Sequence, residues 1–564
     1  MNFFEKIANY IVLHAASIYG GHVRNSYYKN SKNGDKISEK LILKLIKRNK
    51  NTAYGKKYDF KNIKSIKDYQ DKVPFSLYDN YQEYINETIK TGKQNLITKD
   101  KIEFLAKTSG TTGVMKRIPV VKKVKKIYSD SVSVFVNIIQ KEMAKRGHHY
   151  GRGLNLVEIE TAKTVGGIKE GLISSYTIQS SGKVADIITC IPKEALKCGE
   201  ESDMKYIKAF YGLKDRDLTF IASVFTSTIT DLMKYIIENH VLLIRDIKNG
   251  KISDCIDIPA DIKAKLNKKL KPDPKRAKEL QMIMKKPTNQ LIKKIWPKIS
   301  VVIGIGTGEF SGFARKLREY CGEDVAFLNE TYASSECFIG NSTEVNAKDY
   351  FLLYQSAFFE FIPVDDEESR PLLFHELKEG ELYEIVITNL SGLYRYRIKD
   401  VIRVTRFVGK VPMIKFAYRK QQLINITGVK LTSEHISNAI TNFENRTNIK
   451  ILEYCIYPDT NVSPWRMSLF IETSSKVNRN QQNEINQIFD EELAKENKEH
   501  GRMLKIGETS PTCIHIIEEQ TFKKYRDLRI SEGASQNQVK SIRLITTDKQ
   551  LDFFKRAIKK NCDQ

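Results

Sequence analysis

The sequence lacks the cysteine patterns that are typical of metal sites and of secreted, disulfide-bonded folds. Among its eight cysteines no two form a CxxC pair, and none lies with histidines at the spacing of a zinc site. This pattern argues against a structural metal and for a reducing compartment, so we expect a cytoplasmic protein. The cysteines are Cys190, Cys198, Cys255, Cys321, Cys337, Cys455, Cys513 and Cys562.

Long apolar runs are also missing. The N-terminal apolar patch at residues 11–16 follows Glu5 and Lys6 and is far shorter than the roughly 20 residues of a transmembrane helix. It also lacks the basic start of a signal peptide. We therefore predict an amphipathic N-terminal helix and no membrane span.

Acidic residues are too few to balance the basic ones. The chain has 93 Lys and Arg against 68 Asp and Glu, a net charge of +25. One interpretation is a surface that is simply rich in solvated lysine. The other is a surface attracted to nucleic acid, an anionic membrane or an acidic partner. Nucleic acid is the weaker option, because the lysines are diffuse and not interleaved with aromatic residues on one face. Contact with a membrane surface stays open.

No repeat or low-complexity tail interrupts the 564 residues, of which 41% are hydrophobic and 29% charged. This length exceeds one ordinary hydrophobic core, so two or more domains are expected. A Ser-His-Asp or Cys-His signature is not apparent either.

A polar loop between two apolar runs is the first candidate site. Residues 104–120 place four hydroxyl side chains, two glycines and Lys116 between short strand-like runs. Backbone N–H groups converging beside a lysine suit a polyphosphate. The P-loop is excluded, because Gly110 and Gly113 have two residues between them where that motif has four. Taken alone, the stretch favours a Ser/Thr/Gly-rich surface turn.

A strand, a helix and a second strand follow further along the chain. Residues 300–305 form an apolar strand that ends at Gly306, and residues 310–320 form a helix. The strand at 325–328 then leads into a loop at 330–336. This order predicts a parallel sheet with a nucleotide at the carboxyl edge of its strands.

Residues 393–404 alternate with period two after a strand at 382–388. We predict a strand with tyrosines on one face and arginines on the other, ending near Asp400. Beyond Val404 a smaller α+β unit begins, in which Thr432 is expected to cap a helix. The predicted domains are residues 1–410 and residues 411–564.

Three of these stretches resemble the acyl-adenylate-forming superfamily. They are residues 108–116 (TSGTTGVMK), 332–336 (YASSE) and 396–400 (YRIKD). Residues 104–120, 216–250, 332–340, 392–397 and 533–540 resemble one branch more closely, the auxin-responsive Gretchen Hagen family of acyl-acid amido synthetases. The resemblance implies a large N-terminal α/β domain, a smaller mobile α+β C-terminal domain and an ATP site between them.

The resemblance also implies roles for particular residues. The ATP phosphates would be held by the loop residues Ser109, Gly110, Thr111, Thr112 and Gly113. Thr307 and Gly308 would lie by the nucleotide, Tyr332 would pack on adenine, and Asp400 would accept hydrogen bonds from the ribose hydroxyls. Glu336 would bind Mg²⁺, and Lys540 would approach the reacting carboxylate and α-phosphate. Residues 166–176 are a candidate lining for the acyl group.

Two residues depart from the family pattern, and one of them is Thr108, which stands where many members have serine. Glycine usually precedes the aspartate of the third motif, and this chain has Lys399 there. A side chain at this position is expected to alter the turn or to add charge near the ribose.

We predict an ATP-dependent ligase that forms an acyl-AMP from a carboxylic acid and passes the acyl group to an amine, an amino acid. ATP and Mg²⁺ are the expected cofactors, and the protein is expected to be a monomer. An acyl-CoA or acyl-carrier ligase is the first alternative. A basic protein that binds nucleic acid or a membrane surface, and a degenerate fold used for interaction, are the others.

Overall fold

The chain folds into two compact units, of which the first ends at Phe416 and the second begins at Ala417. The computed structural model describes residues 3–108, 116–157, 163–179, 187–195, 198, 203–285, 289–306, 311–420, 424–426, 429–475, 477, 481–532 and 541–559. The predicted division after residue 410 lies at the turn into β16 (Val411–Arg419), a strand of the largest sheet. The roles and the mobility predicted for the two domains stay predictions.

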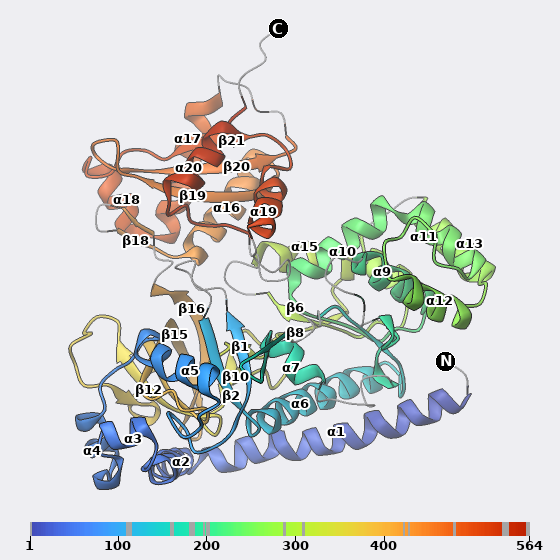
Figure 1. Ribbon diagram of the computed structural model, residues 1–564. Coiled ribbons are helices and arrows are strands. Elements are labelled where there is room, and N and C mark those ends of the chain that lie inside the picture. The colour runs from blue at the N-terminus through green and yellow to red at the C-terminus, as the bar shows by residue number, and fades with distance from the viewer. Residues whose placement is uncertain are drawn as a thin grey trace. The chain divides into compact units, whose positions relative to one another are not determined.

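Helices open the first unit, as predicted. They are α1 (Phe3–Ser31), α2 (Gly34–Asn49), α3 (Ala53–Lys57), α4 (Ile66–Lys72) and α5 (Asp79–Thr91), with a 3-10 turn at Phe60–Asn62. Helix α4 has a reciprocal cap, in which the Ser65 hydroxyl accepts from the Asp68 N–H and the Asp68 carboxylate accepts from the Ser65 N–H. Helix α1 packs along α6 (Val124–Lys145), and the two run side by side in Figure 1.

The first of three sheets in this unit has the strand order β2-β1-β5-β4. Its strands are β1 (Ile102–Thr108), β2 (Lys116–Val121), β4 (Lys163–Val165) and β5 (Ile168–Gly171). Strands β1 and β2 are antiparallel, and Thr108 pairs with Lys116. The predicted strands on both sides of the polar loop are therefore confirmed.

The second sheet is parallel throughout, in the order β3-β6-β7-β8. Its strands are β3 (Gly153–Asn155), β6 (Phe220–Phe225), β7 (Val301–Ile305) and β8 (Ala326–Leu328). The predicted parallel arrangement of β7, α15 (Ser311–Cys321) and β8 is confirmed. The other helices of this region are α7 (Ile173–Gln179), α9 (Met204–Lys214), α10 (Thr226–Glu238), α11 (His240–Asn249), α12 (Ala260–Lys269), α13 (Pro274–Met284) and α14 (Leu291–Ile295).

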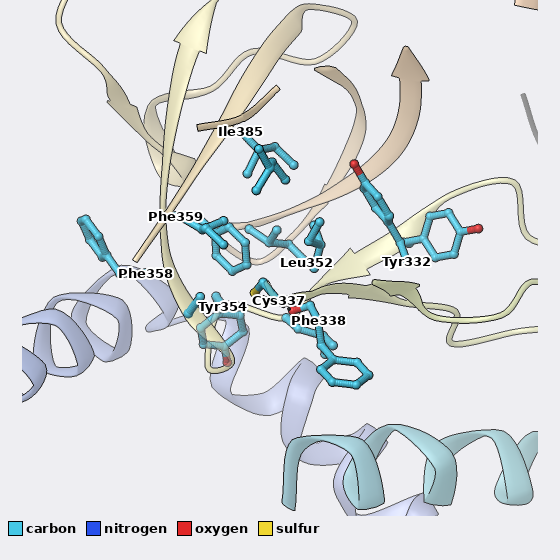
Figure 2. Close-up of a cluster of buried hydrophobic side chains, with 14 of the residues drawn as sticks. Tyr332, Cys337, Phe338, Leu352, Tyr354, Phe358, Phe359 and Ile385 are labelled. Atoms are coloured by element: carbon cyan, nitrogen blue, oxygen red, sulfur yellow. Dashed lines mark hydrogen bonds between the residues drawn. The ribbon is translucent and has the colours of Figure 1, made fainter. Parts of the chain in front are cut away.

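The third sheet has eight strands in the order β13-β12-β14-β15-β16-β11-β10-β9. Besides β16 they are β9 (Tyr332–Ala333), β10 (Phe338–Asn341), β11 (Tyr350–Leu352), β12 (Ala357–Pro363), β13 (Leu372–Leu373), β14 (Leu382–Asn389) and β15 (Tyr396–Val408). A 3-10 turn follows β13 at Phe374–Glu376. Figure 2 shows the apolar cluster on this sheet, which extends from Phe358 at one side to Tyr332 at the other.

The second unit is α+β, as predicted. Its strands are β17 (Ile424–Ile426), β18 (Val429–Leu431), β19 (Ile451–Asp459), β20 (Arg466–Thr473) and β21 (Cys513–Ile517). Its helices are α16 (Ser433–Thr447), α17 (Gln482–Glu496), α18 (Lys498–Lys505), α19 (Thr521–Ser531) and α20 (Asp548–Arg556). The Thr432 hydroxyl accepts from the His435 N–H at 3.2 Å, so the predicted cap is confirmed.

One strand prediction is wrong. Leu393, Tyr394 and Arg395 lie outside β15, which begins at Tyr396. Arg395 is also buried, whereas the alternating pattern placed the arginines on the strand face opposite to the tyrosines. The reason is a distant partner. The Arg395 guanidinium lies 3.1 Å from Glu360 on β12 and donates to the carbonyl oxygens of Gln70 and Val73. This buried pair joins the opening helices to the eight-stranded sheet.

Replacing Arg395 with alanine is expected to lower the free energy of unfolding by about 3–5 kcal/mol, because Glu360 would stay buried without its cation. Urea denaturation of the full chain measures this loss. Arg370→Ala is the control, since Arg370 pairs with Glu376 at an exposed position and its loss should change little. Equal losses in both variants would contradict the structural role of the buried pair.

Candidate active site

The predicted second and third motifs meet through Tyr332 and Asp400. The Tyr332 hydroxyl donates to the Asp400 carboxylate at 3.0 Å, and the two residues are 8% and 2% exposed. The Tyr332 ring also lies against Tyr350 and Phe416, each with its ring centroid at 5.8 Å. The sequence separates these two residues widely, so the sheet is what brings them together.

Asp400 is the last residue of a bulge in β15. Glu384 pairs with Val401 and Val386 pairs with Arg397, so only Ile385 on β14 faces Ile398, Lys399 and Asp400 on β15. Lys399 has a φ of 66°, in the left-handed region that glycine adopts most easily. Bulges re-aim the side chains beside them. The position before Asp400, where the resemblance leads us to expect glycine, is therefore in the left-handed conformation. In this chain a lysine occupies it.

Buried charge holds the Lys399 side chain beside the bulge. Its Nζ lies 4.0 Å from Oε1 of Glu384, a fully buried carboxylate. Arg397 donates to both oxygens of the same carboxylate, at 2.7 and 2.6 Å. Two cations therefore share the Glu384 carboxylate. Its negative charge partly offsets the positive charge that Lys399 brings near Asp400.

A second contact joins the two motifs through Glu336 and Tyr396. Burial, followed by the charge of Glu336, raises the pKa of Tyr396, so Tyr396 stays protonated beside the carboxylate. Asn389 fixes the Glu336 backbone by donating to its carbonyl oxygen at 2.7 Å. Glu336 itself is only half-buried, which leaves it accessible to a ligand.

A cavity of about 20 Å³ adjoins Glu336, enough for about one water molecule. It is lined by Ile173, from the predicted acyl segment, together with Pro119, Val120, Val124, Ile127, Ser334, Ser335, Glu336, Cys337, Phe338, Ser356, Asn389, Leu390 and Ser391. The lining is mostly apolar with a carboxylate and hydroxyls at one side. A ring-sized group would need these side chains to move apart.

The remaining predicted site residues lie outside the described residues. They are Ser109, Gly110, Thr111, Thr112, Gly113, Thr307, Gly308 and Lys540. Their flanks are described: β1 and β2 enclose the first loop, and β7 ends at Ile305 between β6 and β8. Beside the first loop, the Arg117 guanidinium pairs with Glu170 at 2.8 Å, and the Lys116 ammonium lies over the Tyr78 ring.

Comparison with known proteins gives three family matches in order along the chain. Residues 23–326 match the GH3 family N-terminal domain, residues 350–419 the central domain and residues 434–549 the C-terminal domain. The chain belongs to the GH3 family. The resemblance to the Gretchen Hagen branch is thereby confirmed.

Individual GH3 relatives align over nearly the whole chain. The indole-3-acetic acid-amido synthetase GH3.5 of Arabidopsis thaliana is 26% identical and covers 91% of this chain and 89% of its own length. The structure of the GH3.15 acyl acid amido synthetase superposes with a TM-score of 0.82 at 22% identity, covering 93% of this chain and 94% of that one. A 2-hydroxyisobutyryl-CoA ligase in its postadenylation state gives a TM-score of 0.54 at 11% identity, with coverages of 92% and 90%. The predicted adenylate-forming α/β fold is confirmed.

Sequence reasoning missed two side chains in this GH3 site. Tyr396 is predicted as part of the third motif and of an alternating strand, without a role of its own, although a hydroxyl inside the motif is a signal for a polar partner. Glu330 lies two residues after the end of β8 and two residues before Tyr332, the first residue of the second motif. Burial raises the pKa of Glu330 to about 7, so this carboxyl changes charge near neutral pH.

Lys399→Gly is expected to raise the free energy of unfolding by up to about 1 kcal/mol, because glycine removes the cost of a left-handed side chain. The denaturant midpoint measures the gain. Lys399→Asn separates conformation from charge, since asparagine tolerates this region and lacks the ammonium. Lys399→Val should destabilise, because a β-branched residue suits a positive φ worst. A glycine variant less stable than the native chain would contradict the strain at this turn.

Proposed function

We propose that this protein is an ATP-dependent acyl-acid amido synthetase that adenylates a carboxylic acid and transfers the acyl group to an amino acid. The contacts of Tyr332 with Asp400 and of Tyr396 with Glu336 carry the proposal. They bring together the residues that the family resemblance assigns to the nucleotide and the metal. The relatives GH3.5 and GH3.4 of Arabidopsis thaliana are indole-3-acetic acid-amido synthetases, which supports the same reaction class.

The reaction has two steps that balance without a covalent enzyme intermediate. In the first, a carboxylate oxygen attacks the α-phosphorus of ATP, and pyrophosphate leaves to give acyl-AMP. In the second, the amine nitrogen attacks the acyl carbon and loses a proton, and AMP leaves. Both steps build negative charge on oxygen, so fixed donors and cations around the reacting centre lower the barrier.

The nucleotide residues suit their proposed roles. Asp400 is an acceptor-only group when ionised, which fits the two hydroxyls of a ribose. Its bond to Tyr332 occupies one oxygen and orients the carboxylate. Tyr332 would then pack its ring beside the base. Ser109, Gly110, Thr111, Thr112, Gly113, Thr307 and Gly308 complete the proposed phosphate and nucleotide contacts.

Glu336 is the residue that would hold Mg²⁺. Within the described part of the chain no group of three or more His, Cys, Asp or Glu side chains is placed to hold a metal ion. A single half-buried carboxylate still fits, because Mg²⁺ in nucleotide enzymes takes one or two carboxylates and completes its shell with phosphates and water. Bound there, the ion would offset phosphate charge during adenylation.

The substrates we propose are small molecules, and the protein would work as a cytoplasmic monomer. Incubation with ATP, a panel of carboxylic acids and a mixture of amino acids tests the function. Mass spectrometry should find an amide together with AMP and pyrophosphate. An acyl-CoA product in the presence of CoA, with no amide from any acid, would replace the proposal with the ligase alternative.

Glu336→Gln is expected to lower acid-dependent ATP–pyrophosphate exchange about tenfold or more, which corresponds to roughly 1.4 kcal/mol in the barrier. The substitution keeps the size of the side chain but removes its charge. Glu379→Gln, at an exposed carboxylate, is the matched control. Unchanged exchange in the Glu336 variant would remove this residue from the metal site.

Lys540→Ala is expected to depress pyrophosphate exchange strongly and to affect amide formation from supplied acyl-AMP much less. A point charge on a flexible stem suits brief contact with charge that develops at the carboxylate and α-phosphate. The two half-reactions are measured separately on the full chain. If both fall equally, Lys540 does not serve adenylation specifically.

A further inference from the structure

The outer face of α1 is apolar over its first half. Its exposed side chains include Phe4 at 79% and Ile18 at 64% exposure. We call this surface the apolar stripe, and it consists of Phe3, Phe4, Ile7, Tyr10, Ile11, Ile18 and Tyr19, with the exposed Ala8 and Ala15 between them. Large apolar surfaces that stay exposed on a folded chain mark interaction sites.

The inner face of the same helix half is mainly polar or small. Its buried residues are Asn9, Leu13, Ser17 and Gly20. Hydrogen bonds fix this orientation. The Asn9 amide bonds the Gly151 backbone in both directions, at 3.1 and 2.9 Å, and the Asn137 amide donates to the Ser17 carbonyl at 2.9 Å. At Gly20 a Cβ would lie 1.7 Å from the Ser133 carbonyl oxygen, so α6 requires glycine there.

Helix α1 therefore has its polar and small residues inward and its apolar residues outward, and specific contacts hold it in this orientation. Rotating α1 to bury the apolar stripe would break the hydrogen bonds of Asn9 and place a side chain against the α6 backbone. The stripe also lies before residue 23, where the match to the GH3 domain begins. The family's reaction gives no reason for it.

The shape of the stripe favours a broad apolar environment over a second helix. At about 100° per residue, its side chains cover roughly 180° of the helix circumference. A two-stranded coiled coil uses a narrower seam flanked by charged residues. On α1 the positions beside such a seam are themselves apolar, and they include Ile7 and Tyr19. Only Glu5 and Lys6 are charged in the first half of the helix.

Charge distinguishes between two possible partners of the stripe, a second copy of the chain and an anionic surface. A net charge of +25 makes two copies of the chain repel one another, and it attracts an anionic surface. A cation of α6 also lies beside the stripe. Lys126 lies 3.5 Å from the Tyr19 hydroxyl, although Asp130 offsets part of its charge.

We propose that the first half of α1 docks on an anionic lipid bilayer, with the apolar stripe inserted between the headgroups and the basic side chains of α6 near the lipid phosphates. Helices with an apolar face and nearby Lys or Arg lie in this interfacial plane. None of the described helices is long and apolar enough to cross a membrane, so the chain would rest on the surface.

Vesicle co-sedimentation of the full chain tests the proposal. The probes are phosphatidylcholine vesicles with and without about one-third phosphatidylserine, at low and high salt, because the electrostatic share depends on anionic lipid and is screened by salt. Ile11→Asp/Ile18→Asp disrupts the stripe at exposed positions that the fold does not use. Val241→Asp/Met282→Asp makes the same charge change at exposed apolar positions on α11 and α13.

The native chain and the control variant should bind the anionic vesicles, and the stripe variant should bind about tenfold more weakly or worse. Circular dichroism and the unfolding midpoint verify that both variants fold. No binding by the native chain, or equal binding by the stripe variant, would overturn the proposal. So would a dimer in light scattering that the stripe variant alone dissociates, because the second copy would then be the occupant. None of these measurements depends on the enzymatic reaction.

Discussion

The bulge at residues 398–400 is the constraint on which the candidate site depends. Strand β15 has three residues where β14 has one, and Lys399 takes the left-handed conformation that this geometry requires. Asp400 follows directly and meets Tyr332 from the far edge of the same sheet. The two extra residues shift the register of β15 by two, and the left-handed Lys399 re-aims the side chain that follows it, Asp400.

The site also shows how a sheet can support chemistry by linking its strands with polar contacts. Tyr332 with Asp400, and Glu336 with Tyr396, connect two motifs that are far apart in the sequence. Nearby, Arg397 and Lys399 share the buried Glu384, and Arg395 neutralises Glu360. Two of the buried carboxylates in this sheet are therefore paired with cations, and Asp400 accepts a hydrogen bond from the neutral Tyr332 hydroxyl.

Local patterns in the sequence predicted much of this architecture. The β1 and β2 strands, the parallel β7 and β8 pair and the Thr432 cap follow from short-range preferences that the structure keeps. Asp400 and Glu336 were predicted as site residues because their motifs resemble those of a family, and their roles stay predictions. The loops that carry Ser109 and Thr307, and the Lys540 segment, were predicted in the same way and stay predictions.

What could not be predicted depends on partners that are distant in the chain. Alternation at residues 393–404 gave no sign that Arg395 is buried, because Glu360 and the carbonyls of α4 and its end supply its contacts. The N-terminal helix was predicted as amphipathic, and its apolar face would ordinarily be placed inward. Asn9, Ser17 and Gly20 reverse that orientation through contacts with residues more than a hundred positions away.

The central claim is that Asp400 receives the ribose of a nucleotide. The most direct measurement compares the affinities of ATP and 2′,3′-dideoxy-ATP for the native chain and for Asp400→Ala by calorimetry. Hydrogen bonds to a charged carboxylate contribute about 1.5–3 kcal/mol, so the native chain should prefer ATP by roughly tenfold to a hundredfold. The variant should bind the two nucleotides equally. A preference for ATP that survives the loss of Asp400, or a native chain that does not distinguish the two, would contradict the account.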